Sequence, residues 1–178
     1  MNYASLLKAI SSTTAQLQSR AAAAVNQALV IRNWLVGAYI VEFEQNGKDR
    51  AKYGAKLLEK LAMDLANKNM KGLSDPRVLR DCRVIYQIYP QIRGSLTREI
   101  PSTLNTSEIL EITESSASAS SGQEKVTIRG SVPRELPTPL SPHLVLLLSW
   151  TKLQELVRID DPWKRAFFEN ECLKSNWS

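Results

Sequence analysis

Histidine and cysteine are scarce in this sequence, whose 178 residues include one histidine and two cysteines. A structural zinc site takes four Cys or His ligands, so a Cys/His zinc cluster is excluded. We expect Cys82 and Cys172 to be reduced, partly buried thiols, as in a cytosolic protein. His143 lies in the proline-flanked stretch "LSPHL", which favours a structural role over a catalytic one.

Enzymatic motifs are also missing. No Asp or Glu is followed two positions later by Lys, although a metal-dependent nuclease needs carboxylates that converge on a divalent ion and a Lys near the attacking water. The sequence contains neither a glycine-rich phosphate loop nor a nucleophile elbow. We therefore expect a chain that is not an enzyme and that binds no cofactor or metal.

Long hydrophobic runs are absent too. The N-terminus, "MNYASLLKAISS", lacks the basic region and long apolar run of a signal peptide. The most apolar stretch, residues 28–43, is interrupted by Arg32 and Asn33 and is shorter than the roughly 20 residues that span a bilayer. It predicts a buried helix in a cytoplasmic protein with no membrane partner.

Positive charge is concentrated in the N-terminal half. Residues 1–98 contain 15 Lys and Arg against 7 Asp and Glu, whereas residues 99–178 contain 8 against 11. A basic N-terminal half suits a polyanionic partner. Ordinary solvated helix faces would give the same balance, so charge alone leaves both interpretations open.

The spacing of apolar residues predicts a mainly α fold, namely a helical bundle with a helix-turn-helix or winged-helix-like unit. Ser74 is the expected cap of the fourth helix, with Pro76 in its first turn. Asp160 or Asp161 is the expected cap of the last helix. The predicted helices cover residues 3–18, 20–46, 49–68, 73–90, 150–158 and a last segment that begins at 160–162.

Residues 94–142 differ in kind because they are rich in Ser, Thr and Pro. Within them "TESSASASSGQE" (113–124) has too little apolar surface for a core, which predicts a mobile linker. The alternating "KVTIRG" (125–130) predicts one short strand, at most a small β-wing. We expect residues 144–178 to pack on residues 1–93 across this linker.

Two predicted helices joined by a short glycine-containing turn, 49–68 and 74–88, have helix-turn-helix form. The second helix of such a unit offers its first residues to the DNA major groove, where Arg can bind guanine and Gln can bind adenine. The alternative is a helical hairpin with ordinary solvated charges. The candidate base-contacting residues are Arg77, Arg80, Arg83 and Gln87, and the candidate phosphate contacts are Lys52, Lys56, Lys60, Lys68 and Lys71.

The apolar stripe of the second helix is expected to pack on the first. Its members are Val78, Leu79, Cys82, Ile85 and Tyr86, and the expected counterparts are Leu57, Leu61 and Leu65.

Three segments resemble the N-terminal domain of YhcG-like proteins. "GAYIVEFEQNGKDRAKYGAKLLEKLA" (37–62) resembles a family segment with a Gly, a Glu and a Glu-Gln pair before a Tyr-Gly. "LRDCRVIYQIYP" (79–90) resembles the family's Leu-Arg-x-x-Arg-x-x-Tyr-x-x-Tyr-Pro stretch. "LSWTKLQELVRIDDPWKRAFFENECLKSNWS" (148–178) resembles its Leu-Ser-Trp block, which ends in Trp-Ser and leads into another helix.

The resemblance implies a helical, winged-helix-like, DNA-binding domain of bacterial nucleases that are predicted members of the PD-(D/E)xK superfamily. Their nuclease domain follows the Trp-Ser point, so this chain resembles the N-terminal domain without the nuclease domain. The implied function is a non-catalytic module that binds double-stranded DNA. The alternative is an interaction or dimerisation domain that positions a nuclease, as a homodimer or with a nuclease partner, without touching DNA.

Overall fold

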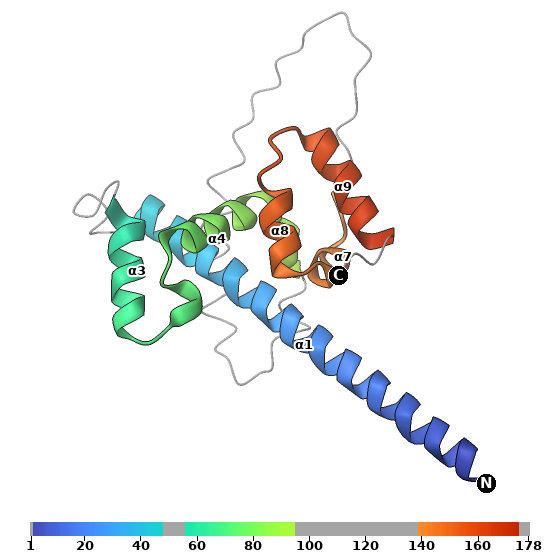
Figure 1. The fold of residues 1–178 in the computed structure, drawn as a ribbon. Coiled ribbons are helices and arrows are strands. Elements are labelled where there is room, and N and C mark those ends of the chain that lie inside the picture. Colours follow the sequence, from blue (N-terminus) through green and yellow to red (C-terminus); the bar gives the residue numbers. More distant parts are fainter. Residues whose placement is uncertain (1, 48–55, 95–138, 175–178) are drawn as a thin grey trace, which may run out of the picture.

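The structure is a computed structural model that describes residues 2–47, 56–94 and 139–174. These residues form helices and contain no strand (Figure 1), so the predicted mainly α fold is confirmed. The predicted linker 113–124 and strand 125–130 lie outside the described residues, and a winged-helix unit is not confirmed. The helices are α1 (Tyr3–Asn46), α3 (Leu57–Asn67), α4 (Pro76–Ile88), α7 (Pro142–Leu147), α8 (Trp150–Leu156) and α9 (Pro162–Lys174), with 3-10 turns η2 (Lys71–Leu73) and η3 (Pro90–Ile92).

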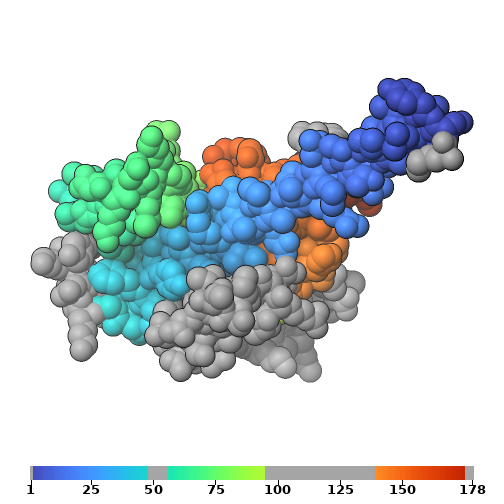
Figure 2. All heavy atoms as spheres, turned by 90° about the horizontal axis from the view of Figure 1, so that it is seen from below, coloured from blue at the N-terminus to red at the C-terminus, as the bar shows by residue number. Residues whose placement is uncertain are grey.

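A single helix, α1, occupies residues 3–46, so the predicted division into helices 3–18 and 20–46 is wrong. No proline or glycine lies at this point, and the four alanines 21–24 that follow are the strongest helix formers. Asn2 caps the helix, because its side-chain oxygen accepts from the Ser5 amide at 2.8 Å. Figure 2 shows the N-terminal end of α1 projecting away from the other helices.

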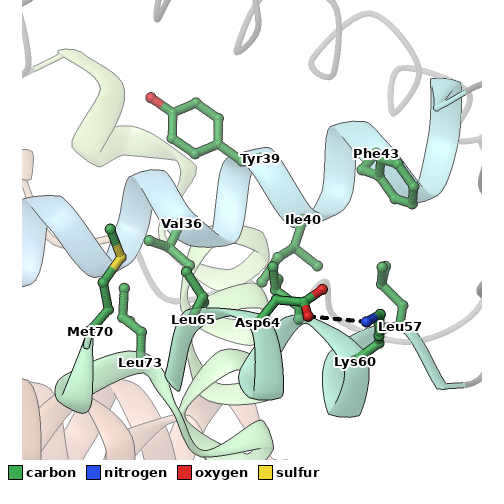
Figure 3. Close-up of a pocket in the computed structure, with 11 residues that line it drawn as sticks. Val36, Tyr39, Ile40, Phe43, Leu57, Lys60, Asp64, Leu65, Met70 and Leu73 are labelled. Carbon is green, nitrogen blue, oxygen red and sulfur yellow. Dashed lines mark hydrogen bonds and ion pairs between the residues drawn. The ribbon is translucent and has the colours of Figure 1, made fainter. Parts of the chain in front are cut away.

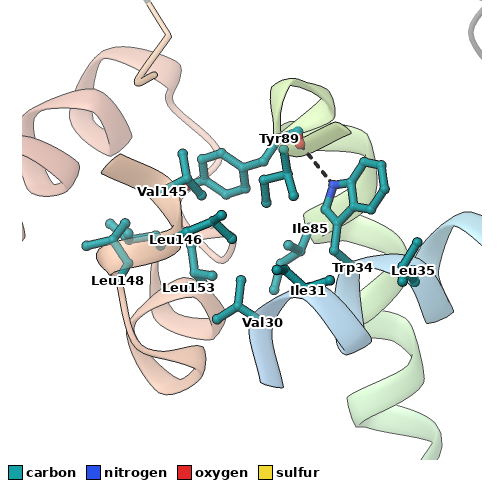
Figure 4. Close-up of a cluster of buried hydrophobic side chains, with 12 residues drawn as sticks. Val30, Ile31, Trp34, Leu35, Ile85, Tyr89, Val145, Leu146, Leu148 and Leu153 are labelled. Carbon is teal, nitrogen blue, oxygen red and sulfur yellow. Dashed lines mark hydrogen bonds between the residues drawn. The ribbon is translucent and has the colours of Figure 1, made fainter. Parts of the chain in front are cut away.

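The larger hydrophobic core joins the middle of α1 to the C-terminal helices (Figure 4). Trp34 is fully buried at its centre, and its ring lies edge-on to Tyr86 with the centroids 4.9 Å apart. The Trp34 indole N–H donates to the Tyr89 carbonyl at 2.9 Å, at the end of α4 where helix carbonyls lack intrahelical partners. The buried members are Val30, Ile31, Trp34, Leu35, Ile85, Tyr89, Ile92, Val145, Leu146, Leu148, Leu153 and Leu156.

A second core lies where α1, α3 and α4 meet, and its buried members are Ile40, Leu58, Ala62, Leu73, Leu79 and Cys82. α1 and α4 approach each other most closely at Gly37. A Cβ added there would overlap the carbonyl oxygen of Cys82 and would lie 2.7 Å from its carbonyl carbon. Only glycine therefore allows this helix crossing.

The start of α4 differs from the prediction by one residue. Asp75, not Ser74, is the cap, because the Asp75 carboxylate accepts from the Arg77 amide at 2.8 Å. Ser74 instead donates to the Lys71 carbonyl. Pro76 occupies the first helical position, as predicted.

The expected packing of α4 on α3 is correct for only part of the stripe. Val78, Leu79 and Cys82 lie in the core shared with α3. Ile85 and Tyr86 instead pack in the larger core beside Trp34. The two halves of the α4 stripe thus contact different partners, and α1 runs beside both.

The C-terminal helices are held to α1 and α4 by polar contacts as well as by the core. Asp161 caps α9 by accepting from the Trp163 amide at 2.8 Å, which decides between the two predicted caps. The Tyr89 hydroxyl donates to the buried Glu169 carboxylate of α9 at 2.7 Å. Gln154 of α8 donates to Asp81 of α4 at 2.7 Å.

The two ends of the segment 95–138 lie against each other. The Gln91 side chain donates to the Leu140 carbonyl at 3.3 Å. A Cβ placed on Gly94 would lie 4.0 Å from Pro142 Cγ. Residues 91–94 and 140–142 are therefore neighbours in space.

Within the described ranges no helix is both long and apolar enough to cross a membrane. The apolar stretch 28–43 is part of α1, and its middle is buried in the two cores, as predicted.

Candidate nucleic-acid interface

The outward face of α4 carries Arg77, Arg80 and Gln87, all of which are exposed. The helix buries Leu79 and Cys82 on its opposite side. With 3.6 residues per turn, positions 77, 80 and 87 share the side that faces away from these two residues. Three of the four predicted base-contacting residues are thus accessible together, two of them near the N-terminal end of the helix.

Arg83, the fourth predicted base-contacting residue, is engaged elsewhere. Its guanidinium forms an ion pair with Glu44 of α1 at 2.7 Å, and the two side chains are 30% and 34% exposed. It lies at the edge of the buried stripe, where it joins α4 to α1. The structure therefore corrects the prediction for Arg83, which has a structural contact in place of an open position.

The predicted phosphate-contacting lysines fall into three groups. Lys56, Lys68 and Lys71 are exposed and form no ion pair with another described residue. Lys60 pairs with Asp64 at 3.0 Å, but both side chains are about half exposed, so this pair is open to exchange. Lys52 lies outside the described residues.

Arg32 is a cation near this region that the sequence reasoning did not select. It donates to the neighbouring Asn33 side chain at 2.8 Å and 3.0 Å. A Cβ on Gly72 would lie 3.5 Å from its guanidinium, which places Arg32 beside Lys71 and the η2 turn. The available signal was its position as the one charge inside the apolar stretch 28–43.

The region from α3 to α4 is positively charged overall. Residues 56–88 contain seven Lys and Arg and four Asp and Glu, a formal net charge of +3. An anionic ligand is favoured at the first turn of α4 by these charges and by the helix dipole. The arrangement suits a polyanion.

The buried titratable groups near α4 do not provide a nucleophile. Burial, followed by the negative charge of Asp81, raises the pKa of the Cys82 thiol to about 12. Burial and then the hydrogen bond to Glu169 raise the pKa of the Tyr89 hydroxyl far above its usual range. Both groups stay protonated at neutral pH, and no cluster of three His, Cys, Asp or Glu among the described residues could hold a metal ion.

An apolar groove of about 600 Å³ lies between α1 and α3 (Figure 3). Val36 and Ile40 of α1 and Leu65 of α3 point into it, and the Lys60–Asp64 ion pair lies at its rim. Leu57, Leu61 and Leu65, the predicted counterparts of the α4 stripe, all line this groove and are partly buried. The mostly apolar lining offers a binding surface without catalytic groups.

Comparison with known families identifies the domain that carries this face. The family described as the DUF1016 N-terminal domain matches residues 9–121, more than half of the chain. The chain belongs to this family. The DUF1016 N-terminal domain match includes most of α1 and all of α3 and α4, so the exposed cations of α4 lie within it.

The resemblance to YhcG-like proteins, drawn from three sequence segments, is also confirmed. A protein of Escherichia coli (strain K12) named "Putative nuclease YhcG" is 40% identical over 68 residues. This match covers 35% of the present chain and 18% of that protein. No solved structure matches the DUF1016 N-terminal domain described in this chain.

Proposed function

We propose that this chain is a non-catalytic DNA-binding module of a YhcG-like nuclease system. The observation that carries the proposal is the outward face of α4, where Arg77 and Arg80 are exposed and form no ion pair with another described residue. The buried face of the same helix fixes the helix in place, so the two arginines project from a rigid support.

The proposed contacts follow from the chemistry of each side chain. Arginine binds the O6 and N7 atoms of guanine with two hydrogen bonds, and Gln87 can bind adenine in the same way. Lys56, Lys68 and Lys71 would contact phosphates on either side of the groove that α4 enters. Such phosphate contacts supply affinity that is independent of sequence and sensitive to salt.

A nuclease context supports DNA as the polyanion, because the E. coli relative carries the name of a nuclease. The module itself has no acid-x-Lys pattern, and we propose that cleavage belongs to another domain or chain. Purified protein incubated with plasmid DNA and Mg²⁺ or Mn²⁺ should leave the DNA intact. Metal-dependent cleavage that is lost when a carboxylate of this chain is substituted would contradict the non-catalytic assignment.

The central test compares two double variants that remove the same charge. Arg77→Ala/Arg80→Ala takes two cations from α4, whereas Arg158→Ala/Lys164→Ala takes two exposed cations from the C-terminal helices. Affinity for duplex DNA is measured as a function of salt for the parent and both variants. The α4 variant should bind more weakly, and its log-log salt slope should shrink by about one unit per lost phosphate contact.

The control variant should behave as the parent does, apart from a small loss due to overall charge. The proposal is overturned if the folded α4 variant binds DNA as the parent does at every salt concentration. It is equally overturned if both variants lose the same affinity, because binding would then depend on net charge alone.

An assembly domain is the second candidate function, and the apolar groove between α1 and α3 favours it. An apolar contact would show little salt dependence, in contrast to binding through phosphates. The same salt titration, carried out with a nuclease partner in place of DNA, separates the two candidates.

A further inference from the structure

The first 23 residues of α1, residues 3–25, form an arm that leaves the body of the molecule (Figures 1 and 2). Large apolar side chains on this arm face solvent. Tyr3 is 80% exposed, Leu7 57% and Leu17 58%. A helix that keeps such side chains in water in one copy of the chain presents a face without a partner.

The exposed side chains form a regular seam. Its members follow one another at alternating intervals of four and three residues: Tyr3, Leu7, Ile10, Thr14, Leu17, Ala21 and Ala24. Apart from Thr14, every member is apolar. This spacing repeats every 3.5 residues on average, which is the period of a coiled coil.

The seam runs directly into the core of the molecule. The next positions in the same spacing are Ala28, Ile31 and Leu35, and the last two are buried against the C-terminal helices. One continuous face of α1 is therefore covered by the body at its inner end and uncovered along the arm.

The arm has little of its own to stabilise it. Lys8 and Arg20 are the only charged side chains from residue 2 to residue 25, so no oppositely charged pair can form along the helix. A solvent-exposed helix that is not packed against anything usually depends on such pairs or on alanine content alone. Packing of the seam on another helix would supply the missing stabilisation.

We propose that two copies of this chain pair through the arms as an antiparallel two-helix coiled coil. The seam is complementary to itself, because residues at alternating four and three spacing interdigitate with the same pattern on a second helix. The absence of acidic residues from the arm removes the charge pattern that would select a different, oppositely charged helix. The second copy is independent of DNA binding by α4.

The antiparallel orientation follows from the length of α1. In a parallel pair the partner's α1 would continue along the seam to its own residue 46 and would meet the body that covers Ile31 and Leu35. In an antiparallel pair the partner's helix ends at its Tyr3 before it reaches the body. When Leu7 lies opposite the partner's Leu17, Tyr3 lies opposite the partner's Ala21, so a large side chain faces a small one.

The oligomeric state of the full chain tests the pairing. Sedimentation equilibrium at tens of micromolar should give a dimer for the parent. Leu7→Glu/Leu17→Glu should give a monomer, because it places four buried carboxylates in the seam of the pair. Ser12→Glu/Ser19→Glu is the matched control: it adds the same charge on the opposite side of the helix and should remain a dimer.

The body should be unaffected by either variant, since the arm makes no part of the two cores; the fluorescence of the buried Trp34 checks this. A monomeric parent overturns the proposal, whether because the seam is covered by the chain's own residues or because it belongs to another protein. A seam variant that remains dimeric overturns it as well.

Disulfide trapping tests the orientation. Leu7→Cys and Leu17→Cys chains are oxidised separately and as a mixture, with the parent as the control for Cys82 and Cys172. The antiparallel alignment predicts covalent dimers that form in the mixture and contain one chain of each kind. Covalent dimers within each separate variant, or none in the mixture, would overturn this alignment.

Discussion

Substitution of Gly37 by alanine should destabilise the fold, although alanine is the better helix former. In an exposed helix interior the change from glycine to alanine stabilises by about 1 kcal/mol. Here the new Cβ would overlap the Cys82 carbonyl oxygen and would lie 2.9 Å from Tyr86 Cβ. Carbon atoms in contact prefer about 3.5–4.0 Å, so α1 and α4 would have to move apart.

The magnitude follows from what this movement disturbs. The overlap involves backbone atoms of α4, so no single side chain can rotate to relieve it. Overpacking of a core typically costs about 1–3 kcal/mol, and we expect the upper end of this range because both cores are shared by the two helices. After subtraction of the gain in helix propensity, the free energy of unfolding should fall by about 2 kcal/mol.

Urea denaturation followed by tryptophan fluorescence measures this loss. With a slope of about 2 kcal/mol per molar, the midpoint of Gly37→Ala should fall by about 1 M. Gly72→Ala is the matched control, because its Cβ would lie 3.5 Å from the Arg32 guanidinium, an ordinary contact. A Gly37→Ala protein as stable as the parent, beside an unchanged Gly72→Ala protein, would refute the close crossing of α1 and α4.

Three further predictions concern the contacts of α4. Tyr89→Phe removes the hydroxyl that donates to the buried Glu169, and it should lower the free energy of unfolding by about 1–3 kcal/mol in urea denaturation; an unchanged value would contradict this role. The Cys82 thiol has a pKa of about 12 in the folded protein, so the unfolded thiol loses its proton first as the pH rises. Its stabilising contribution is complete below about pH 8.5 and should be lost by up to about 1.4 kcal/mol per unit as the pH rises from there towards 12, a loss that Cys82→Ala should reduce and that is measured by denaturation at several pH values. Single substitutions of Glu44 and Arg83 to alanine should each lower stability by at most about 1 kcal/mol, and a double-mutant cycle should give a coupling of similar size; zero coupling would mean that this ion pair does not join α1 to α4.

Local chemistry predicted the helices well where a signal was unambiguous. Pro76 and the apolar stripe placed α4 correctly. The cap was assigned to Ser74 because both it and Asp75 are capping residues, but the residue before a proline is held in the extended region that a cap requires. The first helix was divided near residue 19 on composition alone, and no residue there interrupts a helix.

The partners of each helix were harder to predict, because a stripe shows which face is buried but not what covers it. Ile85 and Tyr86 were expected beside α3 and lie instead beside Trp34. Arg83 is at the edge of the stripe, and its partner Glu44 is 39 residues earlier in the chain. Gly37, a glycine inside an apolar helix, was the one sequence signal for a close crossing with another helix.

The contact between Gln91 and Leu140 has a consequence for how the chain tolerates changes in length. It holds the two ends of the segment 95–138 together from outside that segment, with Gly94 beside Pro142. For a flexible connection, doubling the number of residues changes the closure entropy by only about 0.6 kcal/mol. Relatives could therefore carry much longer or shorter connections at this point with the same helical body, and a folded reporter protein could be inserted here without separating α4 from α7.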